Sequence, residues 1–484
     1  VNGCGDVWIA ANTLVAFASS GKCGAHTVND NGCYFVAGAT FFTAWTNPRD
    51  TPISGVCDPH CHVKNRCFYP MICPKHERHF TFPYETRMLD KFQPAKADPI
   101  LGLGTLFQAD PRDDKIDLGV GVYKDASGNT PIVRAVKHAE TILHQKQTSK
   151  TYVALAGSEL FRDEMRKLVL ANSVAVERVA TLQTPGGTGA IRQVFETMKM
   201  LNPTGTIWIS SPSWPSHMAM ATHMGFKTRA YPYFDAATKM VNTSAMMEAF
   251  NELQAGDLLL LHGCCHNPTG ANLDMATWRA ITDLVIEKSV MPFVDIAYQG
   301  FGDGLDEDAA ALRYMASKVP EMCISASCSK NFGLYRDRVG VAIMIAEDAQ
   351  TAEITQGNLA VLNRLNYSFA PDHGAAVVGL ILSTPELRSD WIAELTEMRH
   401  TMLKVRTDLA DALRQQCNSG EFDFIAHHRG MFSRLGLGPG QVDALRDEHA
   451  MYVVGDSRIN IAGLSGGRHE PFAAAVAKVI GMSS

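Results

Sequence analysis

The sequence lacks any run of uncharged apolar residues of roughly 18 or more, the length that a bilayer-spanning helix needs. It also lacks an excess of positive charge, because 44 Lys and Arg stand against 50 Asp and Glu, for a net charge of −6. Since phosphate neutralisation needs a basic surface, this balance argues against a general nucleic-acid binder. The N-terminus shows no charged region followed by an apolar one, so we find no secretory signal and expect a cytoplasmic protein.

Charged residues are sparse, at 19%, whereas apolar residues make up 46% of the chain. This composition excludes a disordered chain, a collagen-like repeat and a heptad rod. Cysteine is also scarce beyond residue 87, where only five of the twelve cysteines lie, and this part is typical of a reduced cytosolic protein. A length of 484 residues is about that of a two-domain enzyme.

Residues 1–87 differ from the rest, because they hold seven cysteines and no amphipathic periodicity. A metal module is one interpretation, with Cys57, His60, Cys61, His62, Cys67, Cys73 and His76 as ligands. Its spacing is C-x3-C and then C-x5-C, without the C-x2-C pair of common zinc sites. A DNA-binding module is disfavoured by seven Lys and Arg against six Asp and Glu. We favour an N-terminal extension without chemistry, or upstream sequence that is not native to the protein.

From Met88 onward, apolar strand-like runs alternate with amphipathic helical stretches, which predicts an α/β fold with a mostly parallel central sheet flanked by helices. Strands are expected at 206–210, 257–262, 291–296 and 322–326, and a helix at 275–288. Charged amphipathic stretches over 384–417, followed by short strands, indicate a smaller α+β unit. We expect a large domain over 131–397 and a small domain built from 88–130 and 398–484.

One window after a predicted strand combines the residue types that bind a phosphate and present an amine. It contains the hydroxyls of Ser327 and Ser329, the amine of Lys330 and the guanidinium of Arg338. The apolar flanks around Lys330 predict burial, and burial lowers the proton affinity of an amine, as a Schiff-base nucleophile requires.

Three further windows carry weaker signals. Glycines at 186–189 precede a helical stretch and would let its N-terminus approach an anion. The HGCCHNPTG segment at 262–270 is rich in metal ligands, but they are too crowded for a tetrahedral site, and its turn would instead present the Asn267 amide into a cleft. Asp295 lies inside an apolar strand, where a carboxylate needs a cation or strong donors, and a salt bridge is the alternative.

Taken in order, these windows resemble the class I aminotransferases of the aspartate aminotransferase family, which are pyridoxal-phosphate enzymes of fold type I. The motifs are GVGVYKD at 119–125, TPGGTGAIR at 184–192, PSWPSH at 212–217, HGCCHNPTG at 262–270, DIAYQGFGDGL at 295–305 and SCSKNFGLYRDRVG at 327–340. The resemblance covers residues 88–480 and is greatest to the bacterial aspartate and aromatic branch.

The resemblance implies a role for each matching residue around the cofactor. Lys330 would bind the cofactor covalently and later move the Cα proton as general base and acid. Asp295, held by His217, would pair with the protonated pyridine nitrogen. Tyr298 and Asn267 would donate to the phenolic oxygen, and Trp214 would stack on the ring. The phosphate would be bound by Gly187, Thr188, Ser327, Ser329 and Arg338, and by Tyr152 of a neighbouring subunit.

The resemblance also implies a homodimer with shared active sites. Arg458 would bind the substrate α-carboxylate, Arg364 of the partner subunit would bind the distal carboxylate, and Gly121 would lie in a segment that covers the substrate. One departure is Phe369-Ala370, where many aspartate-selective members have Asn-Pro. The bulk of Phe369 near Arg364 leaves open whether the arginine moves aside for an aromatic substrate.

The function that follows is a ping-pong transamination from aspartate or aromatic amino acids to 2-oxoglutarate. Two alternatives stay open. The same cofactor site supports β-elimination or decarboxylation, and an aminotransferase-like domain also occurs in regulators that carry a basic DNA-binding head. No metal ion is expected to take part.

Overall fold

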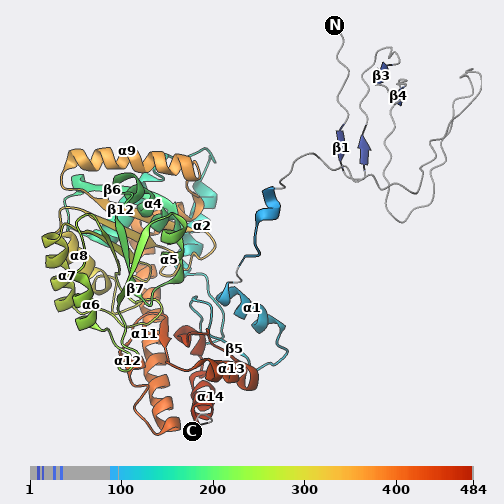
Figure 1. Cartoon of the computed structure of the whole chain (residues 1–484), viewed down its shortest axis with the longest axis vertical. Helices are drawn as coiled ribbons and strands as arrows, with labels where there is room; N and C mark the ends of the chain where they lie inside the picture. The colour runs from blue at the N-terminus through green and yellow to red at the C-terminus, as the bar shows by residue number, and fades with distance from the viewer. Residues whose placement is uncertain are drawn as a thin grey trace, which may run out of the picture. The chain divides into compact units, whose positions relative to one another are not determined.

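The structure, a computed structural model, describes residues 88–95 and 98–481, together with four short strands near the N-terminus (Figure 1). These are β1 (Trp8–Ala10), β2 (Thr13–Val15), β3 (His26–Val28) and β4 (Cys33–Phe35), which form two antiparallel pairs. The chain divides into two units, Val1–Phe92 and Gln93–Ser484. The candidate metal ligands at 57–76, and the DNA-binding and extension hypotheses for residues 1–87, lie outside the described residues.

A seven-stranded sheet forms the centre of the second unit, in the order β6-β12-β11-β10-β9-β7-β8. Every neighbouring pair is parallel except those that β12 makes with β11 and β6, so the predicted mostly parallel sheet is confirmed. The strands are β6 (Val179–Pro185), β7 (Thr206–Ser211), β8 (Lys227–Pro232), β9 (Leu258–His262), β10 (Met291–Ile296), β11 (Met322–Ser327) and β12 (Val339–Ile345). The four predicted strands are found within one residue at each end.

Alternating residues of each central strand pack against helices on opposite faces of the sheet. Leu258 and Leu260 of β9 join one apolar core, and Leu259 and Leu261 join another. Helices α4 (Gly186–Leu201), α5 (Pro215–His223) and α9 (Ala349–Asn366) contribute to the first core. The second core takes residues from α2 (Arg134–Lys146), α3 (Glu159–Leu170), α6 (Thr243–Phe250), α7 (Met275–Glu287), α8 (Glu307–Ala316) and α10 (His373–Ser383). Burial on both faces explains why these strands read as continuous apolar runs.

A separate apolar core lies away from the sheet. It includes Ile116 of β5 (Ile116–Asp117), the nearby Leu118, and residues of α12 (Phe424–His427), α13 (Pro439–His449) and α14 (His469–Gly481). Short strands β13 (Phe432–Arg434), β14 (Met451–Tyr452) and β15 (Arg458–Asn460) accompany them, and α1 (Pro99–Ala109) precedes β5. Among the described helices, none has the length and apolar character to cross a membrane.

The long helix α11 (Pro385–Cys417), labelled in Figure 1, contributes residues to the second core on the sheet and to the separate core. Trp391 and Met402 belong to the second core, on the sheet. Val405 and Leu413 belong to the separate core that contains α12, α13 and α14. The change of core along this helix falls between Met402 and Val405, a few residues beyond the predicted boundary at 397. A large domain over 131–397 and a small domain from 88–130 and 398–484 stay a prediction.

Helix α11 also supports the segment that follows β11. The fully buried Trp391 stacks on Phe332, with ring centroids 4.4 Å apart, and its Nε1 donates to the carbonyl oxygen of Asn331 at 2.7 Å. Because Asn331 follows Lys330 directly, this contact holds the backbone beside the lysine.

The first prediction concerns this contact. Trp391→Phe keeps an aromatic ring but leaves the Asn331 carbonyl without its donor, which should lower the free energy of unfolding by about 1–3 kcal/mol. Ile392→Ala, at a more exposed position on the same helix, should change it by no more than about 0.5 kcal/mol. Urea unfolding of both variants measures the difference, and equal effects would contradict a specific role for the Trp391 contact.

Candidate active site

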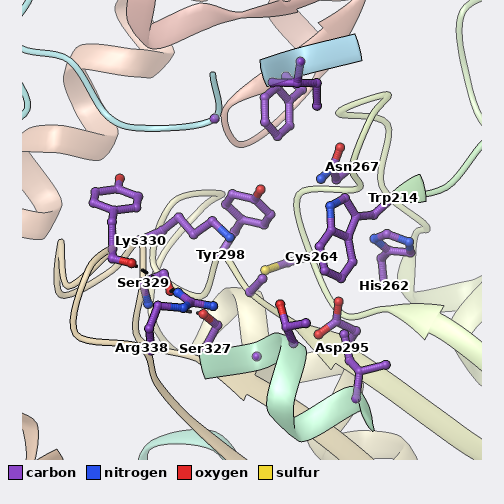
Figure 2. Close-up of a pocket in the computed structure, with 18 of the residues that line it drawn as sticks. Trp214, His262, Cys264, Asn267, Asp295, Tyr298, Ser327, Ser329, Lys330 and Arg338 are labelled. Carbon is purple, nitrogen blue, oxygen red and sulfur yellow. Dashed lines mark hydrogen bonds between the residues drawn. The ribbon is translucent and has the colours of Figure 1, made fainter. Parts of the chain in front are cut away.

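A cavity of about 270 Å³ lies at the carboxyl ends of β9, β10 and β11, where parallel sheets commonly bind ligands (Figure 2). Most of the residues predicted from the sequence line it. They are Gly121, Gly187, Thr188, Trp214, Asn267, Asp295, Tyr298, Ser327, Ser329, Lys330, Arg338 and Arg458. His217 lies directly behind Asp295. Tyr152 and Arg364 are not among the lining residues of this single chain.

One end of the cavity is a cradle for an anion. Arg338 Nη1 donates to Ser329 Oγ at 3.0 Å, and the Ser329 N–H donates to Ser327 Oγ at 3.2 Å (Figure 2). Helix α4 begins here without a side-chain cap, and Gly187 and Thr188 of its first turn line the cavity. A Cβ on Gly187 would lie 3.0 Å from the Ser327 Cβ, so glycine permits this close approach. Uncapped N–H groups, hydroxyls and a guanidinium together favour a phosphate.

Asp295 supplies a negative charge at the other end of the cavity. Its side chain is buried, and its Oδ1 accepts a hydrogen bond from Ser325 Oγ at 2.6 Å, while its Oδ2 lies 3.1 Å from His217 Nε2. Burial alone would raise the pKa of Asp295, but the hydrogen bond and charge of His217, helped by His262 and Ser325, bring it below its ordinary value. The carboxylate therefore stays ionised and is prepared to pair with a cation.

A chain of hydrogen bonds extends from Asp295 away from the cavity. Ser213 Oγ lies 3.0 Å from His217 Nδ1 and 3.1 Å from His262 Nε2. Since an ionised Asp295 only accepts, His217 donates to it from Nε2, and the Ser213 hydroxyl links the two imidazoles. Burial lowers the pKa of His262 to about 3, so this imidazole is neutral.

Lys330 stands between the two ends of the cavity (Figure 2). Its Nζ lies 4.8 Å from the centroid of the Tyr298 ring. Burial lowers the pKa of Lys330 to about 8, the Arg338 charge acts in the same direction, and the Asp295 charge opposes it. A lysine with this pKa has a much larger neutral, nucleophilic fraction near neutral pH than an ordinary lysine.

Arg458 has a buried guanidinium that does not use all of its hydrogen-bond donors. Its Nη2 donates to the Gly119 carbonyl at 2.7 Å, and its guanidinium lies 4.4 Å from the centroid of the Phe432 ring. Its Nε is buried and has no hydrogen-bond partner in the described part of the chain. A buried donor without a partner is costly, so this group is prepared to receive a carboxylate.

The segment that carries Gly121 is held by the side chains of Asn460 and Tyr335. Asn460 Nδ2 donates to the carbonyls of Val120 and Val122, at 2.7 and 2.8 Å. On the other side, the Tyr123 N–H donates to the hydroxyl of Tyr335 at 2.9 Å. These contacts fix the backbone of Gly121 at the mouth of the cavity.

Several lining residues were not predicted from the sequence. They are Ile100, Ile191, His262, Cys264, Ala297, Tyr335 and Phe432. Five of these lie inside the recognised motifs, so their position in the motif was an available signal. Ile100 and Phe432 lie outside every motif and reach the site only through folding.

The described residues include one group with metal-ligand atoms close together, namely Cys264, Cys265 and Asp308. The Asp308 carboxylate already accepts hydrogen bonds from the backbone N–H groups of Gly300, Gly302 and Asp303. Burial raises the pKa of the Cys265 thiol, which disfavours the thiolate that a metal requires. We assign no metal to this group.

A phosphate cradle, an ionised aspartate and a nucleophilic lysine at the edge of such a sheet define a pyridoxal-phosphate enzyme of fold type I. The model of the family "aminotransferase class I and II" matches residues 113–476, and the chain belongs to this family.

Similar proteins are named as aminotransferases, in agreement with this family. The chain is 50% identical over 378 residues to an aromatic-amino-acid aminotransferase of Paracoccus denitrificans, covering 78% of this chain and 96% of the relative. It is 40% identical over 396 residues to the aspartate aminotransferase of Escherichia coli, covering 81% of this chain and all of the relative.

A solved structure of an aromatic-amino-acid aminotransferase from Burkholderia pseudomallei, covalently bound to pyridoxal phosphate, superposes with a TM-score of 0.80 at 39% identity, covering 81% of this chain and 100% of that one.

The second prediction concerns the charge of Lys330. In the cofactor-free enzyme, acetylation of Lys330 should rise with pH around a midpoint near 8, because only the neutral amine reacts. Competitive acetylation followed by mass spectrometry measures the profile, with the exposed Lys404 of the same sample as reference. A midpoint above about 10, as for an unperturbed lysine, would contradict the effect of burial.

Proposed function

We propose that this enzyme transfers amino groups from aspartate and from aromatic amino acids to 2-oxoglutarate, with pyridoxal phosphate as cofactor. The single observation that carries the proposal is the meeting of the anion cradle, Asp295 and Lys330 in one cavity. The names of the relatives, which include both aspartate and aromatic-amino-acid aminotransferases, support the two substrate classes. They also favour transamination over elimination or decarboxylation on the same fold.

The residues present fit the cofactor. Ser327, Ser329, Arg338 and the start of α4 would hold its phosphate, and Asp295 would hold its protonated ring nitrogen. Trp214 would cover one face of the ring, and Tyr298 and Asn267 would donate to its phenolic oxygen. When bound, pyridoxal phosphate supplies an aldehyde that accepts the amino group and a ring that withdraws electrons from Cα.

Lys330 would perform the proton transfer of the reaction. As a neutral amine it would remove the proton from the substrate Cα, and as an ammonium it would deliver that proton to C4′ of the cofactor on the same face. Its lowered pKa suits both directions near neutral pH. Asp295 stays charged throughout because His217 and Ser325 stabilise its ionised form.

Two arginines would hold the substrate carboxylates. Arg458, with its unpartnered Nε, would bind the α-carboxylate in the same chain. Arg364 and Tyr152 lie outside the cavity of their own chain, which supports their action in a second subunit. We therefore propose a homodimer in which each active site takes these two residues from the partner. The five cysteines of residues 98–481 are all free, which supports a cytoplasmic location.

The third prediction tests the proposed reaction. The wild-type enzyme with bound cofactor should form glutamate from 2-oxoglutarate with either aspartate or phenylalanine as donor. Lys330→Ala should form none at a measurable rate, because the Cα proton then has no base. Glutamate formation is measured by a coupled assay, and activity of Lys330→Ala equal to wild type would overturn the assignment.

The same variant tests the shared active site. Lys330→Ala and Arg364→Ala chains are unfolded, mixed in equal amounts and refolded. Half of the resulting dimers are hybrids, and each hybrid has one site with both Lys330 and the partner's Arg364 intact. About a quarter of wild-type aspartate activity should return. If Arg364 acts within its own chain, the mixture will show only the mean of its parents.

A further inference from the structure

Arg406 is a buried cation that the proposed reaction does not use. It lies on α11, is completely buried, and does not line the substrate cavity. Within the described residues, no carboxylate lies within salt-bridge distance of its guanidinium. Burial lowers the pKa of Arg406, so this position disfavours a positive charge. The groups that the guanidinium contacts must therefore stabilise it.

The four hydrogen bonds that Arg406 donates all go to one segment, residues 425–433. Its Nη1 donates to the Ile425 carbonyl at 3.2 Å and to Ser433 Oγ at 2.8 Å. Its Nη2 donates to the carbonyls of Gly430 and Phe432, at 2.7 and 2.8 Å. The planar guanidinium thereby ties the start of this segment to its end.

Ser433 extends these contacts to the loop between β8 and α6. The Lys239 carbonyl only accepts, so His428 Nε2, which lies 2.8 Å away, donates to it. Burial lowers the pKa of His428 to about 3, so this imidazole is neutral and its Nδ1 accepts from Ser433 Oγ at 3.0 Å. The Ser433 hydroxyl therefore accepts from Arg406 and donates to His428, which fixes its orientation.

Segment 425–433 also forms part of the surroundings of Arg458. It carries Phe432, whose ring centroid lies 4.4 Å from the Arg458 guanidinium. The segment packs on the turn that carries Asn267, since a Cβ on Gly270 would lie 2.2 Å from the Phe432 carbonyl oxygen. Asn267 Oδ1 in turn lies 3.5 Å from Arg458 Nη1. Two of the groups around Arg458 thus depend on the position of this segment.

We propose that Arg406 is a positioning residue for the substrate carboxylate, because it holds segment 425–433 so that Phe432 aligns the Arg458 guanidinium. The inference rests on the proposed function, in which Arg458 binds the α-carboxylate. A bidentate pair requires both N–H groups to point at the carboxylate, so a small shift of the supporting ring weakens it. The α-carboxylate is common to aspartate and phenylalanine, so both donors should depend equally on Arg406.

The test compares Arg406→Lys with Arg414→Lys in the cofactor-saturated enzyme. Lysine keeps the positive charge, but one ammonium cannot reach all four acceptors. KM for each donor should rise roughly tenfold, as for the loss of one charge-assisted hydrogen bond. kcat should change less than about threefold, because Arg458 binds the ground state and the transition state alike. Arg414 lies exposed on the same helix and pairs with Asp423, so its variant should keep both constants.

Three further readouts separate positioning from a general structural effect. The Kd of 3-phenylpropionate, which has one carboxylate and no amino group, is measured by calorimetry and should rise by the same factor as KM. Hydroxylamine reacts with the bound cofactor without using a carboxylate site, and its rate should be unchanged in Arg406→Lys. In the Arg458→Ala background, Arg406→Lys should cause no further loss of kcat/KM, because both changes act on one contact.

The outcomes are distinct. Wild-type KM and Kd in Arg406→Lys overturn the proposal, and so does a parallel fall in the hydroxylamine rate, which reports damage to the whole cavity. Additive losses with Arg458→Ala also overturn it.

If Arg406→Lys does not fold, Ser433→Ala decides, because it removes one acceptor of Arg406 and the donor to His428. Its KM and Kd should rise about threefold, and wild-type values would overturn the proposal. If the wild-type enzyme transaminates neither donor, the proposed function fails instead, and this result is visible before any variant is made.

Discussion

The ionised carboxylate of Asp295 is the constraint on which the rest of the site depends. A negative charge at a buried position on a central strand is unfavourable unless the fold provides donors for it. Ser325 comes from the neighbouring strand β11, directly opposite Asp295 in the register, and His217 comes from α5. The charge therefore requires the strand order and the helix placement to be correct at once.

The surrounding architecture converts that charge into a reaction centre. Parallel strands bring the ends of β9, β10 and β11 to one edge, so Asn267, Asp295 and Lys330 meet although they come from separate motifs. Strands β13 and β15 carry Phe432 and Arg458 to the cavity, and helix α11 connects the small core to the backbone beside Lys330. The core on the sheet and the small core are thus joined beside the residues that would bind the substrate.

The sequence was informative where burial or close packing limits the choice of residue. Central strands such as β10 are buried on both faces and were predicted from their apolar runs, whereas the edge strand β8 is largely exposed and carries no such pattern. The residues within the motifs were predicted to share one site because the motifs occur along the chain in the same order as in the family. Phe432 could not be predicted, because its contact with Arg458 exists only after β13 pairs with β15. The stacking of Phe369 on Tyr152 likewise joins segments far apart in the chain. The sequence showed the bulky side chain at 369 but not its partner.

The most direct test of this account is the rate at which the cofactor-loaded enzyme releases oxaloacetate from aspartate in a single turnover, compared between wild type and Asp295→Asn. Asparagine preserves the size of the side chain but removes its charge, while the phosphate cradle is untouched. The account predicts that the variant retains cofactor and slows by at least roughly a hundredfold, as expected when a preorganised charge is removed. A variant that retains cofactor and reacts within about threefold of the wild-type rate would show that the Asp295 charge is not central to the chemistry.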